Sequence, residues 1–331
     1  MKARGRNGQV KRMSNAVSCN GKEHELLIQM GECSVAILPR LGGKISSIRV
    51  KDQELLQTPL IYYAPRSKTM PFESSDASGW DECLPAVTAC KVQTAHGAVE
   101  VPDHGDLWRV PWQTLAKTEN SLTMRGECFT LPLVLKRRLA VTETGHGYLI
   151  QSDYTLTNTG SFEVPWLWSA HPGFLAQVGD TLQLPQSIQS LRIEWTRHHR
   201  LDTSSGEAAW PLAALSDGAK TDLRVTPKQN SGVGDKLFAG PLSASENWAV
   251  LERPSVGVRL RISFDAARTP YLGLWICQDG FPECEGERQH CVALEPTTAP
   301  VDSLSIPGPW SRTLAPGESI DWPMTVAIER L

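Results

Sequence analysis

The stretch CVALEPTTAP, residues Cys291–Pro300, joins an apolar run to one acid and a proline. The run Val292–Leu294 predicts a strand that enters a core. Pro296 cannot donate a hydrogen bond to a sheet, so we expect strand pairing to loosen just after Glu295. A carboxylate there is costly to bury and tends to have a raised pKa, which suits a general base. The alternative is a strand-end glutamate that faces water or pairs with an arginine.

The rest of the chain repeats the strand pattern with few breaks. Val256–Phe264 alternates apolar and polar residues, and Tyr148–Leu156 does the same before the turn sequence TNTG. We expect further strands at Glu25–Met30, Ser34–Pro39, Lys44–Val50, Val87–Thr94, Trp108–Ala116, Ser121–Cys128, Val134–Val141, Glu163–Ser169, Asn247–Glu252, Tyr271–Cys277 and Ser319–Ile328. The chain is therefore predicted to be all-β, a sandwich or a barrel.

Three segments depart from this pattern. Lys51–Leu60 and Ala208–Leu215 are weak helix candidates. The segment Thr196–Gly240 is rich in Ser, Asp, Gly and Pro, and its strand signal is poor. It is either a long surface excursion or a loop that borders a functional cleft.

Length and charge limit the function classes. The 331 residues carry a net charge of -3, and no basic stripe suggests nucleic acid as a partner. No stretch approaches the ~20 apolar residues of a membrane span. Basic residues are frequent in the first thirteen positions, but no apolar run of signal-peptide length follows. We expect residues 1–20 to be a disordered tail, residues 21–331 to be one domain, and the protein to be cytoplasmic.

Cysteine and tryptophan usage adds two expectations. The eight cysteines are scattered and form no CxxC pair, so we expect free thiols. No HxH or HxxxH pair is present, and we expect no metal site. The eleven tryptophans can fill a core or serve as platforms for flat ligands such as sugar rings.

Four stretches place polar residues beside aromatic residues and tight turns. They are SGWDECLP (Ser78–Pro85), PDHGDLW (Pro102–Trp108), WLWSAHPGF (Trp166–Phe174) and YLGLWICQDGF (Tyr271–Phe281). His171 follows an apolar strand and precedes a proline, as Glu295 does, so it must be partly desolvated. Asp106 and Asp279 could equally be turn residues, and His104 a satisfied loop histidine.

The order of these motifs resembles a known family. GGKISSI, HGDLW, SAHPGF, ALEPTTAP and LAPGES follow one another as in the aldose 1-epimerases, or galactose mutarotase-like proteins, over the span Gly21–Leu331. The resemblance implies a large antiparallel β-sandwich, the supersandwich, with a sugar site on a concave sheet face. It also implies a small sugar as the partner, no cofactor, and a monomer or homodimer.

The chemistry that the resemblance implies is mutarotation. A base takes the proton of the anomeric hydroxyl while an acid protonates the ring oxygen, and the ring opens and recloses with the anomeric centre inverted. By resemblance Glu295 matches the base and His171 the acid, and His104 matches a histidine that binds the sugar. We expect the carboxylate and the imidazole to face one cleft, a sugar-ring width apart, and to titrate as a coupled pair.

The chain also departs from the family pattern. GWDECLP stands where an asparagine-arginine motif is expected, and Arg66 is a loosely matching cation. Acids near the expected pocket suit neutral sugar hydroxyls and would repel a phosphate. The candidate substrate-binding residues are therefore His104, Asp279, Trp80, Asp81, Glu82, Arg66 and Asp106.

Two other functions stay open at this stage. The first is a carbohydrate-binding protein on the same fold that does no chemistry, because a fold does not determine a function. The second is a glycoside-processing enzyme, which needs two carboxyl groups at the scissile bond. Glu295 and Asp279 could supply them.

Overall fold

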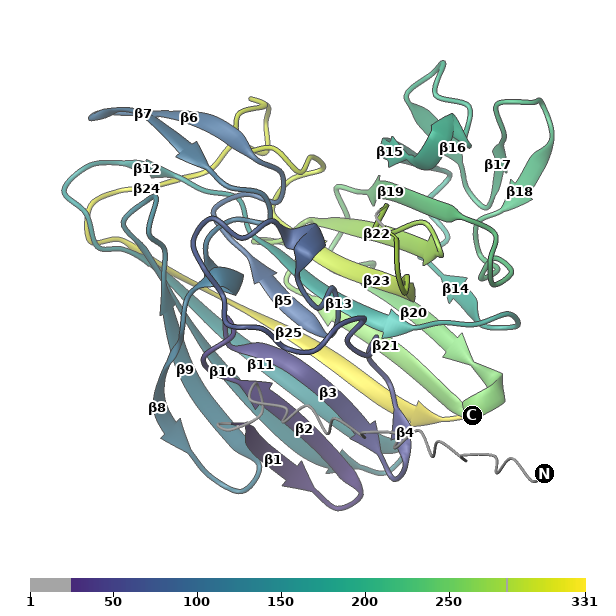
Figure 1. The fold of residues 1–331 in the computed structure, drawn as a ribbon, viewed down its shortest axis with the longest axis horizontal. Helices are drawn as coiled ribbons and strands as arrows, with labels where there is room; N and C mark the ends of the chain where they lie inside the picture. The colour runs from purple at the N-terminus through teal and green to yellow at the C-terminus, as the bar shows by residue number, and fades with distance from the viewer. Residues whose placement is uncertain (1–24, 284) are drawn as a thin grey trace, which may run out of the picture.

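The computed structural model describes residues 25–283 and 285–331, and these form two large β-sheets that face each other (Figure 1). Within the described residues, the first sheet has eleven strands and runs in the order β1-β2-β3-β5-β13-β23-β22-β19-β15-β16, with β4 beside β3. Its strands are β1 (Leu26–Met30), β2 (Cys33–Leu38), β3 (Lys44–Val50), β4 (Gln53–Glu54), β5 (Trp80–Cys83), β13 (Ser169–Leu175), β15 (Ser190–Thr196), β16 (Glu207–Ala209), β19 (Val233–Ala239), β22 (Tyr271–Gln278) and β23 (His290–Thr297).

The second sheet has eight strands in the described chain, in the order β14-β20-β21-β25-β11-β10-β9-β8. They are β8 (Gln113–Lys117), β9 (Ser121–Glu127), β10 (Leu133–Thr144), β11 (Gly147–Asn158), β14 (Thr181–Gln183), β20 (Trp248–Arg253), β21 (Val258–Phe264) and β25 (Ser319–Arg330). Three small pairs and four short 3-10 turns complete the described elements: β6 (Cys90–Thr94) with β7 (Gly97–Val101), β12 (Val164–Pro165) with β24 (Thr313–Leu314), β17 (Leu212–Ala214) with β18 (Lys220–Asp222), η1 (Phe72–Ser74), η2 (Leu107–Arg109), η3 (Arg197–His199) and η4 (Pro254–Val256).

The core lies between the two large sheets and explains the period-two pattern. Alternate residues of β21 and β11 are buried, because one face of the second sheet packs on the core and the other meets solvent. β23 is different: from its second residue to its last every residue is buried, as expected of a central strand covered on both faces. Neighbouring strands β22 and β23 pair antiparallel, as do β10 and β11. The all-β antiparallel sandwich predicted from the sequence is confirmed.

Several local expectations were wrong. β23 does not loosen after Glu295, because it continues to Thr297 and Pro296 pairs in register with Leu272 of β22. Neither weak helix candidate forms a helix, because both contain residues that pair in strands: β4 lies in the first, and most of β16 and all of β17 lie in the second.

The segment 196–240 was predicted to lack strong strands, yet it contains β19. All seven residues of β19 are buried, and the strand lies between β15 and β22 in the first sheet. Its sequence VGDKLFA has charged residues in the middle, which hides the strand from a search for apolar alternation.

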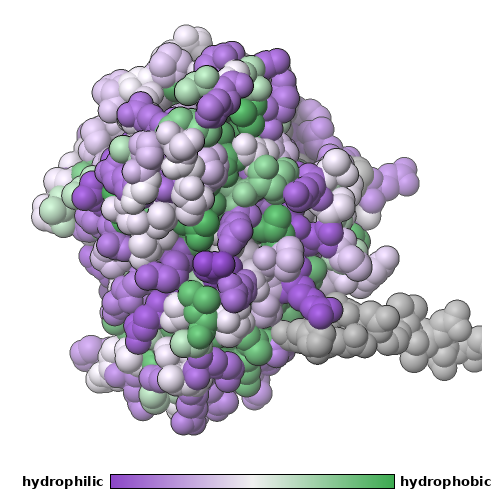
Figure 2. Space-filling model, turned by 90° about the vertical axis from the view of Figure 1, so that its left-hand side faces the viewer, coloured by the Kyte–Doolittle hydropathy of each residue, from purple (hydrophilic) through white to green (hydrophobic). Residues whose placement is uncertain are grey.

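The six described cysteines are free thiols, as predicted. Cys19, Cys284 and the predicted N-terminal tail lie outside the described residues. Within the part of the chain that the structure describes, no helix is long and apolar enough to span a membrane. The surface shown in Figure 2 mixes hydrophilic and hydrophobic residues in small groups.

Candidate active site

The strand register brings His171 and Glu295 together. β13 and β23 pair antiparallel, with Ser169 opposite Thr297 and Gly173 opposite Ala293. His171 and Glu295 lie halfway between these two pairs. They therefore stand opposite each other and point to the same face of the sheet. His171 Nδ1 lies 2.9 Å from Glu295 Oε1, so the two groups are in direct contact and not separated by the width of a sugar ring.

Lys236 of β19 is the third member of this group, and the sequence analysis missed it. Its ammonium contacts Glu295 Oε2 and lies 3.7 Å from Asp302 Oδ1, and its side chain is only 8% exposed. Gly273 stands in register with Glu295, and a Cβ there would lie 3.0 Å from Glu295 Oε2. Glycine at that position therefore leaves room for the carboxylate. A lysine inside the strand VGDKLFA was the signal that could have revealed this residue.

The charges around Glu295 reverse the expected direction of its pKa shift. Burial alone would raise the pKa of Glu295, but Lys236 and His171 outweigh burial and hold it at about 2. The raised pKa expected from the sequence was therefore wrong, because the cation from β19 was not foreseen. Asp302 behaves in the opposite way: burial raises its pKa to about 6, although Lys236 opposes the shift.

His104 lies beside this pair. Its imidazole stacks on the ring of Phe72 at 3.6 Å between centroids, and its centroid is 5.6 Å from that of His171. Nδ1 lies 2.8 Å from Asp103 Oδ2, while burial lowers the pKa of His104. The residue is in the left-handed region at φ 57°, and a Cβ on the following Gly105 would collide with a backbone oxygen. The HG pair therefore fixes the ring over the site.

His104, His171 and Lys236 line a cavity of about 450 Å³, which is large enough for a small ligand, and Glu295 lies buried behind His171 and Lys236. One wall is aromatic: the rings of Trp195 and Trp275 lie 5.7 Å apart over Gly234, whose missing side chain permits their approach. The described residues that line the cavity are Phe72, Val87, Thr88, Asp103, His104, His171, Glu194, Trp195, Lys236, Trp275, Phe281, Gln289 and Asp302. Aromatic faces beside polar groups suit a sugar ring.

Asp279 does not line this cavity. It borders a neighbouring one of about 590 Å³, where Oδ1 lies 3.4 Å from His290 Nε2 and Oδ2 accepts a hydrogen bond from the backbone of Asn230. A hydrolase that uses Glu295 and Asp279 as a pair therefore gains no support from the geometry.

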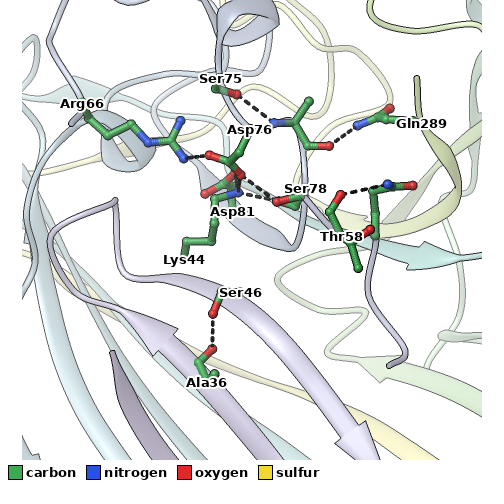
Figure 3. Close-up of polar contacts among 12 residues, drawn as sticks. Ala36, Lys44, Ser46, Thr58, Arg66, Ser75, Asp76, Ser78, Asp81 and Gln289 are labelled. Atoms are coloured by element: carbon green, nitrogen blue, oxygen red, sulfur yellow. Dashed lines mark hydrogen bonds and ion pairs between the residues drawn. The ribbon is translucent and has the colours of Figure 1, made fainter. Parts of the chain in front are cut away.

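Asp81 and Arg66 belong to a buried ionic network shown in Figure 3. Lys44 Nζ lies 2.5 Å from Asp81 Oδ2 and 3.1 Å from Asp76 Oδ2, and Arg66 Nη2 lies 2.5 Å from Asp76 Oδ1. Trp80, next to Asp81, is fully buried in the main core. The network supports the loop between β3 and β5, and its described members do not line the cavity.

The carboxylates of Glu82 and Asp106 also accept hydrogen bonds from other residues of the protein, and neither side chain lines the cavity. Glu82 points between the sheets, where Tyr154 and Arg137 are among its hydrogen-bond donors. Asp106 Oδ2 accepts hydrogen bonds from the backbone N–H of Phe129 and from both the backbone N–H and the hydroxyl of Thr130.

Of the residues singled out in the sequence, the described cavity lining includes His104 and His171, and Glu295 lies behind His171. Among the described residues, no group of three or more His, Cys, Asp or Glu side chains is arranged to hold a metal ion.

The two facing sheets form a large antiparallel β-sandwich. No family model and no curated protein matches the sequence. Among solved structures, a protein from Synechocystis sp. PCC 6803 is similar with a TM-score of 0.67 and 18% identity, covering 93% of this chain and 96% of that one. A galactose mutarotase related enzyme from Lactobacillus acidophilus has a TM-score of 0.64 and 15% identity, covering 92% and 97%.

A galactose mutarotase-like protein from Lactobacillus casei is similar with a TM-score of 0.60 and 16% identity, covering 92% of this chain and 100% of that one. The resemblance read from the sequence motifs is therefore confirmed at the level of the fold. Identities this low establish shared architecture and leave the activity to be argued from the site.

Proposed function

We propose that this protein is an isomerase that interconverts the α and β anomers of an aldose, with Glu295 as base and His171 as acid. The observation that carries the proposal is the contact of His171 Nδ1 with Glu295 Oε1 beside the cavity. Both atoms are buried, and the imidazole of His171 lines the cavity, so a ligand bound there would lie directly beside the pair. The structural likeness to a galactose mutarotase related enzyme adds support.

The proposed reaction needs only the side chains of this chain. In ring opening the O1–H bond breaks and its proton goes to the carboxylate of Glu295. The C1–O5 bond breaks with its electron pair on O5, which takes a proton from the imidazolium of His171. Rotation about C1–C2 then presents the other face of the aldehyde, and the ring recloses on it.

Lys236 decides how strong a base Glu295 is. With the ammonium on Oε2 the carboxylate is held ionised, which keeps it ready to accept a proton but lowers its basicity. A sugar hydroxyl that accepts a hydrogen bond from Lys236 would weaken this ion pair and raise the pKa of Glu295. Substrate binding itself would therefore activate the base.

We further propose a neutral aldose as the substrate. The cavity is lined by Asp103, Glu194 and Asp302, and its lysine is already engaged by two carboxylates. A phosphate would meet these acids without a free cation among the described lining residues, whereas hydroxyl groups can donate hydrogen bonds to them.

One observation favours a second candidate, a sugar-binding protein without catalysis. The pKa of about 2 for Glu295 is low for a general base that works near neutral pH. If the ammonium of Lys236 stays in place when sugar binds, the cavity binds a ligand and does no chemistry.

The deciding experiment follows α/β interconversion of a panel of neutral aldoses by polarimetry and saturation-transfer NMR. We expect the wild type to accelerate at least one sugar, and Glu295→Gln and His171→Asn each to lose ~10²–10⁴-fold in kcat. Asp153→Asn, an exposed carboxylate on β11 paired with Arg138, is the matched control and should keep the wild-type rate. Binding without acceleration on any sugar would establish the second candidate instead.

A further inference from the structure

Two cavities follow each other along the strands of the first sheet. The first is the cavity of about 450 Å³ lined by His171, and the second is the cavity of about 590 Å³ lined by Asp279. On β13, His171 lines the first cavity and Leu175 the second. Side chains four residues apart in a strand point to the same face and lie about 13 Å apart. The two cavities are therefore neighbours on one face of the sheet.

A pair of indole rings lies between the two cavities. On the strand of β19, Gly234 stands midway between Lys236, which lines the first cavity, and Gly232, which lines the second. A Cβ on Gly234 would lie 3.1 Å from the ring of Trp195 and 3.4 Å from that of Trp275, so the two rings cover this glycine. Trp195 is 40% exposed. An aromatic surface between the cavities is thus open to a ligand.

A β-bulge directs Trp195 to this position. β15 and β19 pair with Ile193 opposite Leu237 and Trp195 opposite Lys236, which leaves Glu194 as the extra residue. A bulge changes the direction in which a strand presents its side chains, and bulges are frequent beside functional sites. Here Glu194 and Trp195 both line the first cavity although they are adjacent in the sequence. The backbone of the sheet therefore determines where the exposed indole lies.

The second cavity offers hydrogen-bond donors and acceptors with balanced charges. Its described lining includes the cations Arg197 and Arg288 and the acids Asp279 and Glu287. Nε of Arg197 is buried and has no hydrogen-bond partner within the described chain, and the carboxylate with which it pairs, Glu283, is 3.7 Å away. Hydroxyl groups both donate and accept hydrogen bonds, so they fit this mixed lining. The second cavity therefore suits a neutral polyhydroxylated ligand.

We propose that the substrate is a reducing oligosaccharide, with its reducing unit at His171 and its next unit on Trp195 and in the second cavity, beside Arg197 and Asp279. This inference rests on the proposed mutarotase function. C4 of a pyranose lies across the ring from C1, so a unit joined through O4 extends away from the anomeric centre. The C–H faces of that unit can pack on the indole. The second unit contributes binding and takes no part in the bond changes at C1.

The test compares each disaccharide with its own reducing unit in the anomer-exchange measurement. The pairs are cellobiose with glucose, galactobiose with galactose, mannobiose with mannose and xylobiose with xylose, all joined through O4. We expect kcat/KM to be at least about tenfold higher for one disaccharide, chiefly through a lower KM. Trp195→Ala should lower this ratio by up to about tenfold. Tyr62→Ala is the matched control, because Tyr62 is 72% exposed and lines neither cavity.

Arg197→Met tests whether the second unit reaches the second cavity. Methionine keeps much of the length of the side chain and removes its hydrogen-bond donors. The KM for the disaccharide should therefore rise about tenfold more than the KM for the monosaccharide. If Trp195→Ala lowers the disaccharide preference and Arg197→Met leaves it unchanged, the second unit lies elsewhere and the proposed placement is wrong.

Binding separates this inference from the proposed function. Isothermal titration calorimetry measures the Kd of the same sugars whether or not the protein is catalytic. An active wild type that shows no preference for any disaccharide would refute this inference alone. A wild type that exchanges no anomer would refute the mutarotase function. In that case tighter disaccharide binding that is lost in Trp195→Ala would still support the two-cavity site, and equal affinities within every pair would overturn it.

Discussion

Glu82 and Glu295 are both fully buried and each contacts a cation, yet their surroundings and hydrogen bonds differ. Glu82 points into the space between the sheets and accepts three side-chain hydrogen bonds, at 2.8 Å from Arg137, 2.9 Å from Tyr154 and 2.9 Å from Trp168. Both of its oxygens are used. Glu295 points to the face of the sheet that carries His171 and Lys236, and its Oε1 lies 2.9 Å from His171 Nδ1.

The pKa values of Glu82 and Glu295 shift in opposite directions. Burial is the dominant effect on Glu82 and raises its pKa in spite of Arg137, whereas Lys236 and His171 reverse the effect of burial on Glu295. A buried acid whose hydrogen bonds are complete stabilises the packing of two sheets. A buried acid held ionised by a lysine and a histidine that both line a cavity is suited to bind or react.

The largest effect we expect on stability is from Glu82→Gln. The substitution leaves the guanidinium of Arg137, which is 1% exposed, without its charge partner, and breaking a buried pair costs about 3–5 kcal/mol. Urea denaturation should show this loss in the free energy of unfolding, while the folded fraction keeps the anomer-exchange rate of wild type. Glu295→Gln should lose less stability, because Lys236 keeps Asp302 as a partner. Equal losses in both variants would erase the distinction between the two acids.

A smaller but more specific effect is expected from Lys236→Met. Without the ammonium, burial of Glu295 is opposed mainly by His171, so its pKa should rise from about 2 to above the ordinary 4.5. Titration of the labelled carboxyl carbon by NMR measures the shift directly. Lys136→Met on β10 is the matched control, because that lysine is exposed on the other sheet. A pKa that stays near 2 would mean that Lys236 does not set the charge of the site.

Sequence reasoning predicted the fold, and it placed His171 and Glu295 at one site, because both predictions depend on local pattern. The period of two predicted the sheets, and the two motifs SAHPGF and ALEPTTAP placed His171 and Glu295 at positions that the register of β13 and β23 brings into contact. The same reasoning assigned Glu82 to the sugar. Side chains alternate across a strand, so Asp81 and Glu82 must face opposite ways, but which face meets the cavity depends on the packing of the second sheet.

Lys236 and Asp302 could not be placed from the sequence for a related reason. Their importance comes from distances to Glu295 between segments that lie far apart in the chain, and no motif encodes a distance. The predicted direction of the pKa shift of Glu295 was wrong for the same reason, because the sign of the shift depends on whether a cation reaches the buried carboxylate.

The smallest effect we expect is a pH dependence that isolates Asp302. Its folded pKa of about 6 lies above the 3.8 of an unperturbed aspartate, so the folded state holds this proton more tightly. Its contribution to the free energy of unfolding is therefore fully present below pH 3.8 and is lost as the pH rises through about 6, by about 1–3 kcal/mol. Urea denaturation between pH 4 and 7 should show wild type losing stability relative to Asp302→Asn over this window, while Asp153→Asn runs parallel to wild type. Parallel curves for all three proteins would show that the carboxyl group of Asp302 titrates alike in the folded and unfolded chain.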